Sequence, residues 1–123
     1  MEAGSAWLLT CLERFTGSWE SHVQHDPRGR FLQLKKGEKI IDYVLRLIDA
    51  GRIFVGCEGN EKALAYSIER VGPKPFMFAS DFPHEISISN CMEEIDEVLE
   101  REDLKQEHKM AILGDNARRF YGR

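Results

Sequence analysis

Apolar residues recur at helical spacing in two stretches of the first half of the chain. In residues 6–23 they lie three, four, seven and eleven positions after the first, which is the spacing of an amphipathic helix. They are Leu8, Cys11, Leu12, Phe15 and Trp19. Residues 24–37 carry Pro and Gly among charged side chains, which indicates a loop. Helical spacing returns in residues 40–48, and Gly51 offers a carboxyl-terminal cap, so a second helix is predicted there.

The pattern then changes to short apolar runs. Residues 52–57 and 76–80 are rich in β-branched or aromatic side chains and suit strands that are buried on both faces. Between them, residues 61–70 predict a helix capped by Asn60 and ended by a Gly-Pro pair. Two buried strands joined through a helix are typical of a βαβ unit with a parallel sheet.

Helices are predicted for the rest of the chain. An Asn-x-x-Glu capping box at residue 90 and an Asp-x-x-Gln box at residue 103 start two of them, the second reaching residue 113. Gly114 ends that helix, and Asp115 can cap a final turn in residues 116–121. The fold class is therefore α/β and helix-rich, with about two parallel strands. Because such a small sheet leaves both edges unpaired, part of a larger sheet is expected to be missing.

Composition and charge narrow the classes of function. A chain of 123 residues makes one domain at most, and 17 basic against 21 acidic residues, with no basic block, argue against a nucleic-acid partner. No apolar run approaches the roughly 18 residues of a membrane helix, so no membrane partner is expected. The three cysteines are far apart and form no Cys-x-x-Cys element. They indicate reduced, half-buried thiols in a cytoplasmic protein.

Candidate chemistry lies just after the two predicted strands. Ligands of parallel α/β folds collect beyond the carboxyl ends of the strands, which selects Glu58 and Asp81. Asp81 is followed by Phe-Pro-His84-Glu85, so two carboxylates and an imidazole share one loop. Oxygen and nitrogen donors of this kind suit Zn²⁺ or another divalent ion.

Two motifs resemble a known family. They are Ser-Asp-Phe-Pro-His at residues 80–84 and Ile-Leu-Gly-Asp-Asn-Ala-Arg-Arg-Phe-Tyr at residues 112–121. In this order and spacing they resemble the closing segment of the amidohydrolase-related metal-dependent hydrolases, which include the aminocarboxymuconate-semialdehyde decarboxylase branch. Residues 2–8 are also similar to the segment that follows the sixth barrel strand in many members. The resemblance covers essentially the whole chain.

The resemblance implies a TIM (β/α)₈ barrel of which residues 1–123 form one partial domain, barrel units six to eight. It makes residues 52–57 the seventh strand and residues 76–80 the eighth. Asp81 becomes the aspartate that binds the metal and orients or deprotonates its water. Full members carry further histidine ligands on their first and middle strands, which have no counterpart here. A complete barrel needs roughly 250 residues.

Each proposed site residue also has a simpler interpretation, in which it has no role in chemistry or ligand binding. Asp81 could be a turn or capping carboxylate, His84 could be a loop histidine fixed by hydrogen bonds, and Glu58 could be an exposed acid. If they are functional, His84 and Glu58 bind substrate. From the second motif, the polar residues Asn116, Arg118 and Arg119 are expected to anchor the last helix.

The expected function is that of a carboxyl-terminal fragment of a metal-dependent hydrolase or decarboxylase. The substrate would be a small carboxylated molecule, and the metal, most simply zinc, would activate water. Because only Asp81 of the ligand set is present, the chain alone is expected to be inactive. The alternative is a non-catalytic remnant that serves as an assembly module. It would bury its open edges against a second copy or against a chain that supplies the missing strands.

Overall fold

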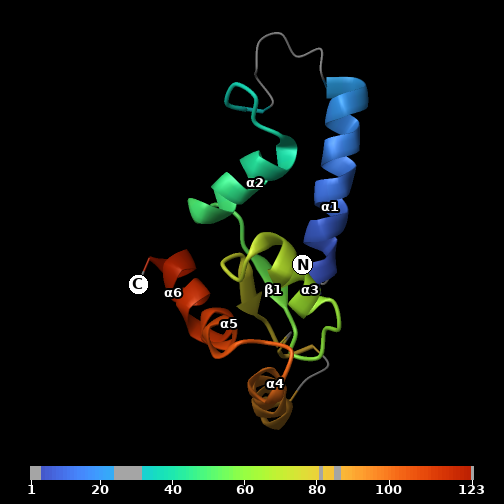
Figure 1. Ribbon diagram of the computed structural model, residues 1–123. Helices are drawn as coiled ribbons and strands as arrows, with labels where there is room; N and C mark the ends of the chain where they lie inside the picture. The colour runs from blue at the N-terminus through green and yellow to red at the C-terminus, as the bar shows by residue number, and fades with distance from the viewer. Residues whose placement is uncertain (1–3, 24–31, 81, 85–86, 123) are drawn as a thin grey trace.

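Two helices form one end of the molecule (Figure 1). Helix α1 (Gly4–Ser18) continues into a wider π-type turn (Trp19–Val23) and packs against α2 (Ile40–Asp49), so both predicted helices are confirmed. The computed structural model describes residues 4–23, 32–80, 82–84 and 87–122. The buried apolar side chains of α1 and α2 face each other and the sheet. They are Leu8, Leu12, Ile40, Val44 and Ile48.

Helix α2 ends as its sequence predicts. Gly51 adopts a positive φ of 68°. Its N–H donates to the carbonyl of Ile48 and the N–H of Arg52 donates to that of Leu47, both at 2.9 Å. This pair of bonds is the Schellman motif, in which glycine avoids the steric cost of the left-handed conformation.

The sheet consists of β1 (Val55–Cys57) and β2 (Phe76–Phe78), which pair in parallel with Gly56 opposite Met77. Helix α3 (Leu64–Val71) joins them and completes the predicted βαβ unit. Both strands are shorter than predicted. Within the described residues each strand has one neighbour, so the ladder extends only where the two overlap.

Helix α3 begins later than the sequence indicates. Asn60 does not cap it; the residue before the helix is Ala63. Residues 61–64 form a turn instead, in which the N–H of Leu64 donates to the carbonyl of Glu61 at 3.2 Å. The Glu61 side chain accepts hydrogen bonds from two backbone N–H groups outside α3.

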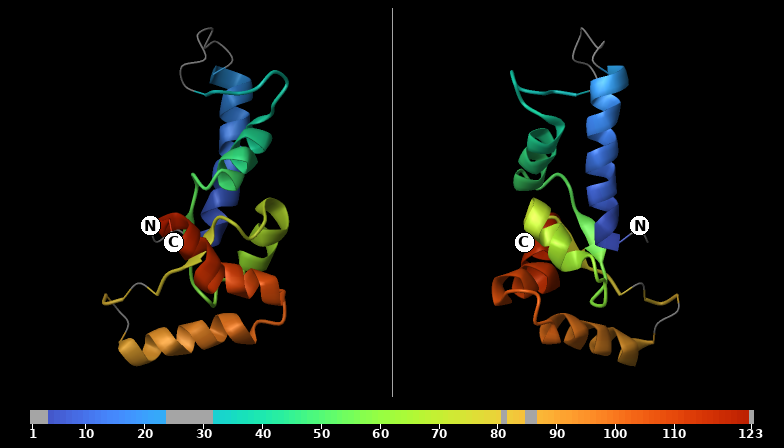
Figure 2. Two further views of the ribbon diagram at one scale, coloured as in Figure 1. Left: turned by 90° about the vertical axis from the view of Figure 1, so that its left-hand side faces the viewer. Right: turned by 45° about the vertical axis from the view of Figure 1, so that its right-hand side comes forward.

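Helix α4 (Ile88–Glu100) lies across the end of the molecule at which the strands finish (Figure 2). The capping residue is Ser87, whose hydroxyl accepts the N–H of Asn90 while the Asn90 amide oxygen accepts the N–H of Ser87. The predicted box at residue 90 is therefore wrong by three residues. The hydroxyl of Ser87 takes the capping role, which makes Asn90 the third residue of the helix.

The last helix is continuous. It consists of α5 (Gln106–Met110), a π-type turn (Ala111–Asp115) and α6 (Asn116–Tyr121). The predicted break at Gly114 is wrong: Ile112 before it and Asn116 after it are both buried, which favours one helix held along its length. The predicted cap Asp103 is also wrong, because its carboxylate binds Arg101 instead. No helix in the described part is long and apolar enough to span a membrane.

Polar side chains anchor this helix, as the sequence predicts. The buried Asn116 amide donates to the carbonyls of Pro73 and Phe76, both at 2.8 Å. Arg119 donates to the carbonyl of Ile48, at the end of α2. Arg118 differs, since it forms an exposed ion pair with Asp115 of its own helix at 2.8 Å.

Glu38 fastens the segment before α2 to that helix. Its carboxylate is 9% exposed and accepts from Arg46 Nε at 2.7 Å and Nη2 at 2.9 Å, and from the N–H of Lys35 at 2.8 Å. The hydrogen bonds to Arg46, more than the other contacts, lower the pKa of Glu38 from 4.5 to about 2.

We predict that Asn116→Ala lowers the free energy of unfolding by about 2 kcal/mol, because the buried carbonyl of Phe76 loses the amide donor and the partly buried carbonyl of Pro73 keeps only the N–H of Phe76. Asn116→Asp keeps the shape but points a carboxylate at both carbonyls, so it should be less stable still at pH 7 and recover as that carboxylate is protonated. Urea denaturation at pH 7 and pH 5 measures both effects. Asn60→Ala, at an exposed asparagine, is the control, and equal stability of the two alanine variants would contradict the anchoring role.

We predict that Glu38 contributes to acid sensitivity. Because its folded pKa of about 2 lies below the ordinary 4.5, its contribution is present above pH 4.5 and is lost as the pH falls towards 2. Glu38→Gln should therefore be less stable than the wild type at pH 7, and the two should converge near pH 2. Thermal melts over this range, with Glu69→Gln as an exposed control, measure the difference. Parallel profiles of wild type and Glu38→Gln would contradict the assignment.

Candidate functional site

Both strands finish at the same edge of the sheet. Cys57 is opposite Phe78 at the ends of β1 and β2, and the N–H of Ala79 donates to the carbonyl of Cys57 at 3.0 Å. The segments that begin at Glu58 and Ala79 therefore leave the sheet side by side. Asp81, the predicted metal ligand and catalytic residue, lies outside the described residues, so its role stays a prediction.

Glu58 and His84, the predicted substrate-binding residues, are both exposed. The backbone N–H of Glu58 donates to Glu61 Oε1 at 3.0 Å. Within the described residues neither the Glu58 nor the His84 side chain forms a hydrogen bond or an ion pair. The structure thus leaves both side chains accessible to a ligand but does not bring them into a shared contact.

Glu61 is the residue of this region that sequence reasoning missed. Its carboxylate accepts the N–H of Ser5 at 2.6 Å and the N–H of Glu58 at 3.0 Å, so it joins the start of α1 to the loop after β1. A carboxylate at a helix N-terminus is favoured by the unpaired N–H groups and by the helix dipole. Gly4 fits this contact, because its φ is +63° and a Cβ there would lie 3.0 Å from the Glu61 carboxyl carbon.

Arg101 holds the same loop from the other side. Its Nη1 donates to the carbonyls of Gly59 at 2.8 Å and Glu61 at 2.7 Å, while Nε and Nη2 donate to both carboxylate oxygens of Asp103. The bonds to Asp103 raise the pKa of Arg101 further above its ordinary value. Gly59 packs against α4 so closely that a Cβ would lie 2.7 Å from the carbonyl oxygen of Glu94. The loop after β1 is therefore fixed between α1 and α4.

The cysteines are free thiols, as expected. Cys57 is buried at the end of β1, and burial, followed by the charge of Glu61, raises its pKa to about 12. The thiol therefore remains protonated at neutral pH and is a packing residue rather than a nucleophile. Cys91 and Cys11 are half-buried, and Cys91 Sγ lies 3.5 Å from Ser80 Oγ.

The described residues do not complete a metal site. They contain no group of three or more His, Cys, Asp or Glu side chains placed to hold an ion. A stable zinc site takes three or four protein ligands. Metal binding at this edge therefore needs donors beyond the described residues, of which Asp81 is one candidate in this chain.

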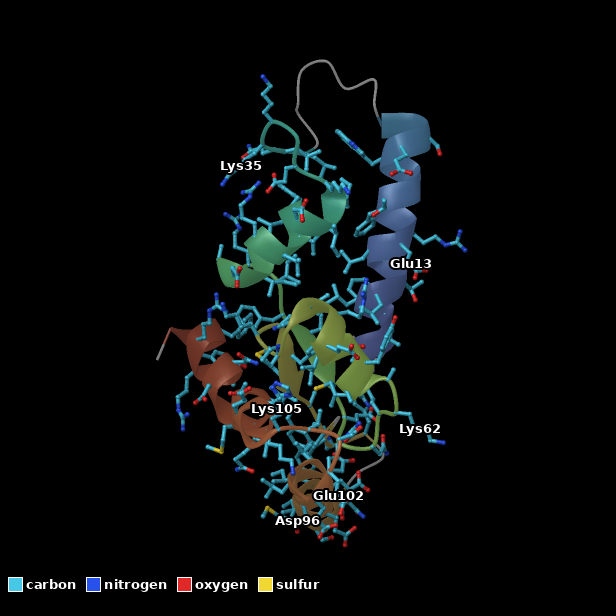
Figure 3. All side chains as sticks on the ribbon, viewed as in Figure 1. Glu13, Lys35, Lys62, Asp96, Glu102 and Lys105 are labelled. Atoms are coloured by element: carbon cyan, nitrogen blue, oxygen red, sulfur yellow. The ribbon has the colours of Figure 1, made fainter. Side chains whose placement is uncertain are left out.

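Two hollows differ in their relation to the strand ends. An open polar hollow of about 500 Å³ lies beside the loop after β1, between Lys62, Glu97, Glu100 and Arg101; Figure 3 shows Lys62 pointing outward here. An apolar cavity of about 290 Å³ lies between α1 and α2, lined by Phe15, Trp19, Tyr43 and other side chains. Neither Glu58 nor His84 is among the described residues that line these two hollows, so neither hollow identifies the candidate site.

The profile of the amidohydrolase family matches residues 3–123. The match spans nearly the entire chain, and the chain therefore belongs to the amidohydrolase family, whose members are generally metal-dependent hydrolases. Comparison with curated proteins and with solved structures gives no match. The family resemblance of the two motifs is confirmed, and membership in the decarboxylase-like branch stays a prediction.

We predict that Glu61→Gln lowers the free energy of unfolding by about 1–3 kcal/mol. The amide offers one oxygen where two N–H groups need acceptors, and it removes the charge from the start of α1. Urea denaturation measures the change. Glu58→Gln, three residues away and exposed, is the matched control and should be close to neutral. Equal losses in the two variants would contradict the bridging role of Glu61.

Proposed function

We propose that this chain supplies the last part of the active site of a metal-dependent hydrolase or decarboxylase that acts on a small carboxylated substrate. The observation that carries the proposal is the family match over residues 3–123, because it includes the Asp81 loop that follows β2. The parallel pairing of β1 with β2 supports it, since the two segments after these strands leave the sheet at one edge.

Each candidate residue has a role in this proposal. Asp81 is a metal ligand, and a bound divalent ion, zinc by the chemistry of the donors, supplies Lewis-acid activation of water. Glu58 and His84 contact the substrate at the mouth of the site. Their exposure supports this placement, because neither side chain is committed to another protein group among the described residues.

The proposal requires groups from outside the described residues. Two features support this requirement: β1 and β2 have no further neighbour in the described part of the chain, and that part holds no complete ligand set. The remaining strands and ligands then come from another part of the same polypeptide, from a separate chain or from a second copy. The 123 residues by themselves are expected to be inactive.

We predict that co-expression with the part of a family member that runs through its sixth barrel strand yields a complex that binds metal and turns over small carboxylated substrates. Asp81→Asn should lower bound zinc and turnover by at least about tenfold, because the amide keeps the size of the side chain but removes its charge. His84→Ala should have a smaller effect, mainly on KM. Elemental analysis and a hydrolase and decarboxylase substrate panel are the measurements.

Asp115→Asn is the matched control for this experiment, because Asp115 is exposed and forms only a surface ion pair. A complex with Asn at position 81 that binds metal and turns over as well as the wild type would overturn the role of Asp81. A stable complex that binds no metal and has no activity would favour the alternative, a non-catalytic assembly module.

A further inference from the structure

Helix α4 carries an apolar stripe that the described part of the chain leaves mostly exposed; three of its members are exposed and the fourth, Ile95, is half-buried. Its members recur at the spacing i, i+4, i+7 and i+11, so they form one line about 16 Å long. They are Ile88, Met92, Ile95 and Leu99. Ile88 is 76% exposed, Met92 58% and Leu99 43%. Surface apolar residues are common singly, but a continuous helical line of them is typical of a contact surface.

The helix that bears this stripe is fixed in place by its neighbouring side. Val98 is fully buried and meets the loop after β1 at Gly59. The Nζ of Lys109 donates to the carbonyl of Leu99 at 2.6 Å and so holds the end of α4 against the last helix. These contacts use one side of α4, and the stripe lies beside it. The molecule therefore presents the stripe on an ordered helix.

The side of α4 beyond the stripe is acidic. Between Ile88 and Glu100 the helix contains no Lys or Arg. Its exposed acids are Glu93, Asp96, Glu97 and Glu100. At 100° per residue, Asp96 is directly beside the stripe and the other acids continue around the helix. Figure 3 shows Asp96 on the part of α4 that faces away from the sheet.

The negative charge beside the stripe distinguishes between the partners that could bind there. Antiparallel pairing of α4 with α4 of a second copy would bring the two acidic sides close together, and like charges across an interface are unfavourable. Parallel pairing would turn the acidic side of each helix towards the partner's side of α4 that is already packed against its own molecule. A partner with basic side chains beside an apolar line gains both contacts. We propose that α4 docks a basic amphipathic helix of another protein, whose apolar residues lie on the stripe and whose Lys or Arg side chains face Asp96, Glu93 and Glu100.

We predict that the chain binds a fluorescein-labelled 16-residue peptide of Leu, Lys and Ala, with Leu at positions 1, 5, 8 and 12 and Lys along one flank. Ile88→Gln with Met92→Gln should weaken binding at least about tenfold by removing the apolar contact. Glu93→Gln with Asp96→Asn and Glu100→Gln should do so by removing the charge. Fluorescence anisotropy measures binding, which should also weaken between 50 and 300 mM salt because exposed charges are screened.

Two controls make the test specific. Tyr66→Gln with Glu69→Gln removes an exposed aromatic and an exposed acid from α3 and should leave binding unchanged. A peptide with Glu in place of Lys should not bind. Circular dichroism confirms that each variant folds. Absence of binding, or equal binding of the Glu peptide, would overturn the proposal. So would a dimer by light scattering that the Ile88→Gln/Met92→Gln variant abolishes. None of these outcomes depends on metal binding or turnover.

Discussion

One carboxylate determines how the carboxyl end of the sheet is built. Glu61 receives an N–H group from the start of α1 and another from the loop after β1, and so connects segments that are 56 positions apart in the chain. Arg101 completes the arrangement by holding the carbonyl groups of the same loop. The bonds to Ser5 and to the carbonyls of Gly59 and Glu61 are partly buried, where an N–H or carbonyl without a partner is costly, so these side chains favour the backbone conformation that the loop adopts.

This constraint also explains how far the sequence could predict the fold. Apolar periodicity located the first two helices, because periodicity depends on which face is buried, and short apolar runs located both strands. The errors fall on the ends of elements: the strands are shorter than predicted, the last helix does not break at Gly114, and the predicted amino-terminal helix caps are wrong. Asp103 and Glu61 have the local chemistry of helix starts, yet Asp103 binds Arg101 and Glu61 serves α1 and β1. Local patterns cannot reveal a partner that is distant in sequence, whereas Gly51 ends α2 as predicted because its Schellman bonds are local.

The candidate site shows the same difference between features that depend on the local sequence and contacts that depend on residues distant in the chain. The position of Glu58 directly after a predicted strand was enough to select it, and in the structure Glu58 follows the last residue of β1 at the edge of the sheet. The side chains that shape the region, Glu61 and Arg101, carry no motif, and the positive φ of Gly4 at the start of α1, which fits the Glu61 contact, is seen only in the structure. Family membership supplies the class of chemistry. The barrel is implied by that family alone, since the described sheet has two strands.

The π-type turn in the last helix has a consequence for how this sequence can vary. A π-type turn contains one residue more than an α-helical turn, so every later side chain lies about one residue's rotation short of where a regular α-helix of the same residues would place it. Here the turn precedes Asn116, whose amide meets the carbonyls of Pro73 and Phe76. Regular α-helical geometry over residues 111–115 would rotate Asn116 by about 100° and carry its amide away from both carbonyls. Substitutions that favour a regular α-helix in this turn are therefore expected to loosen the anchor although they leave Asn116 itself unchanged.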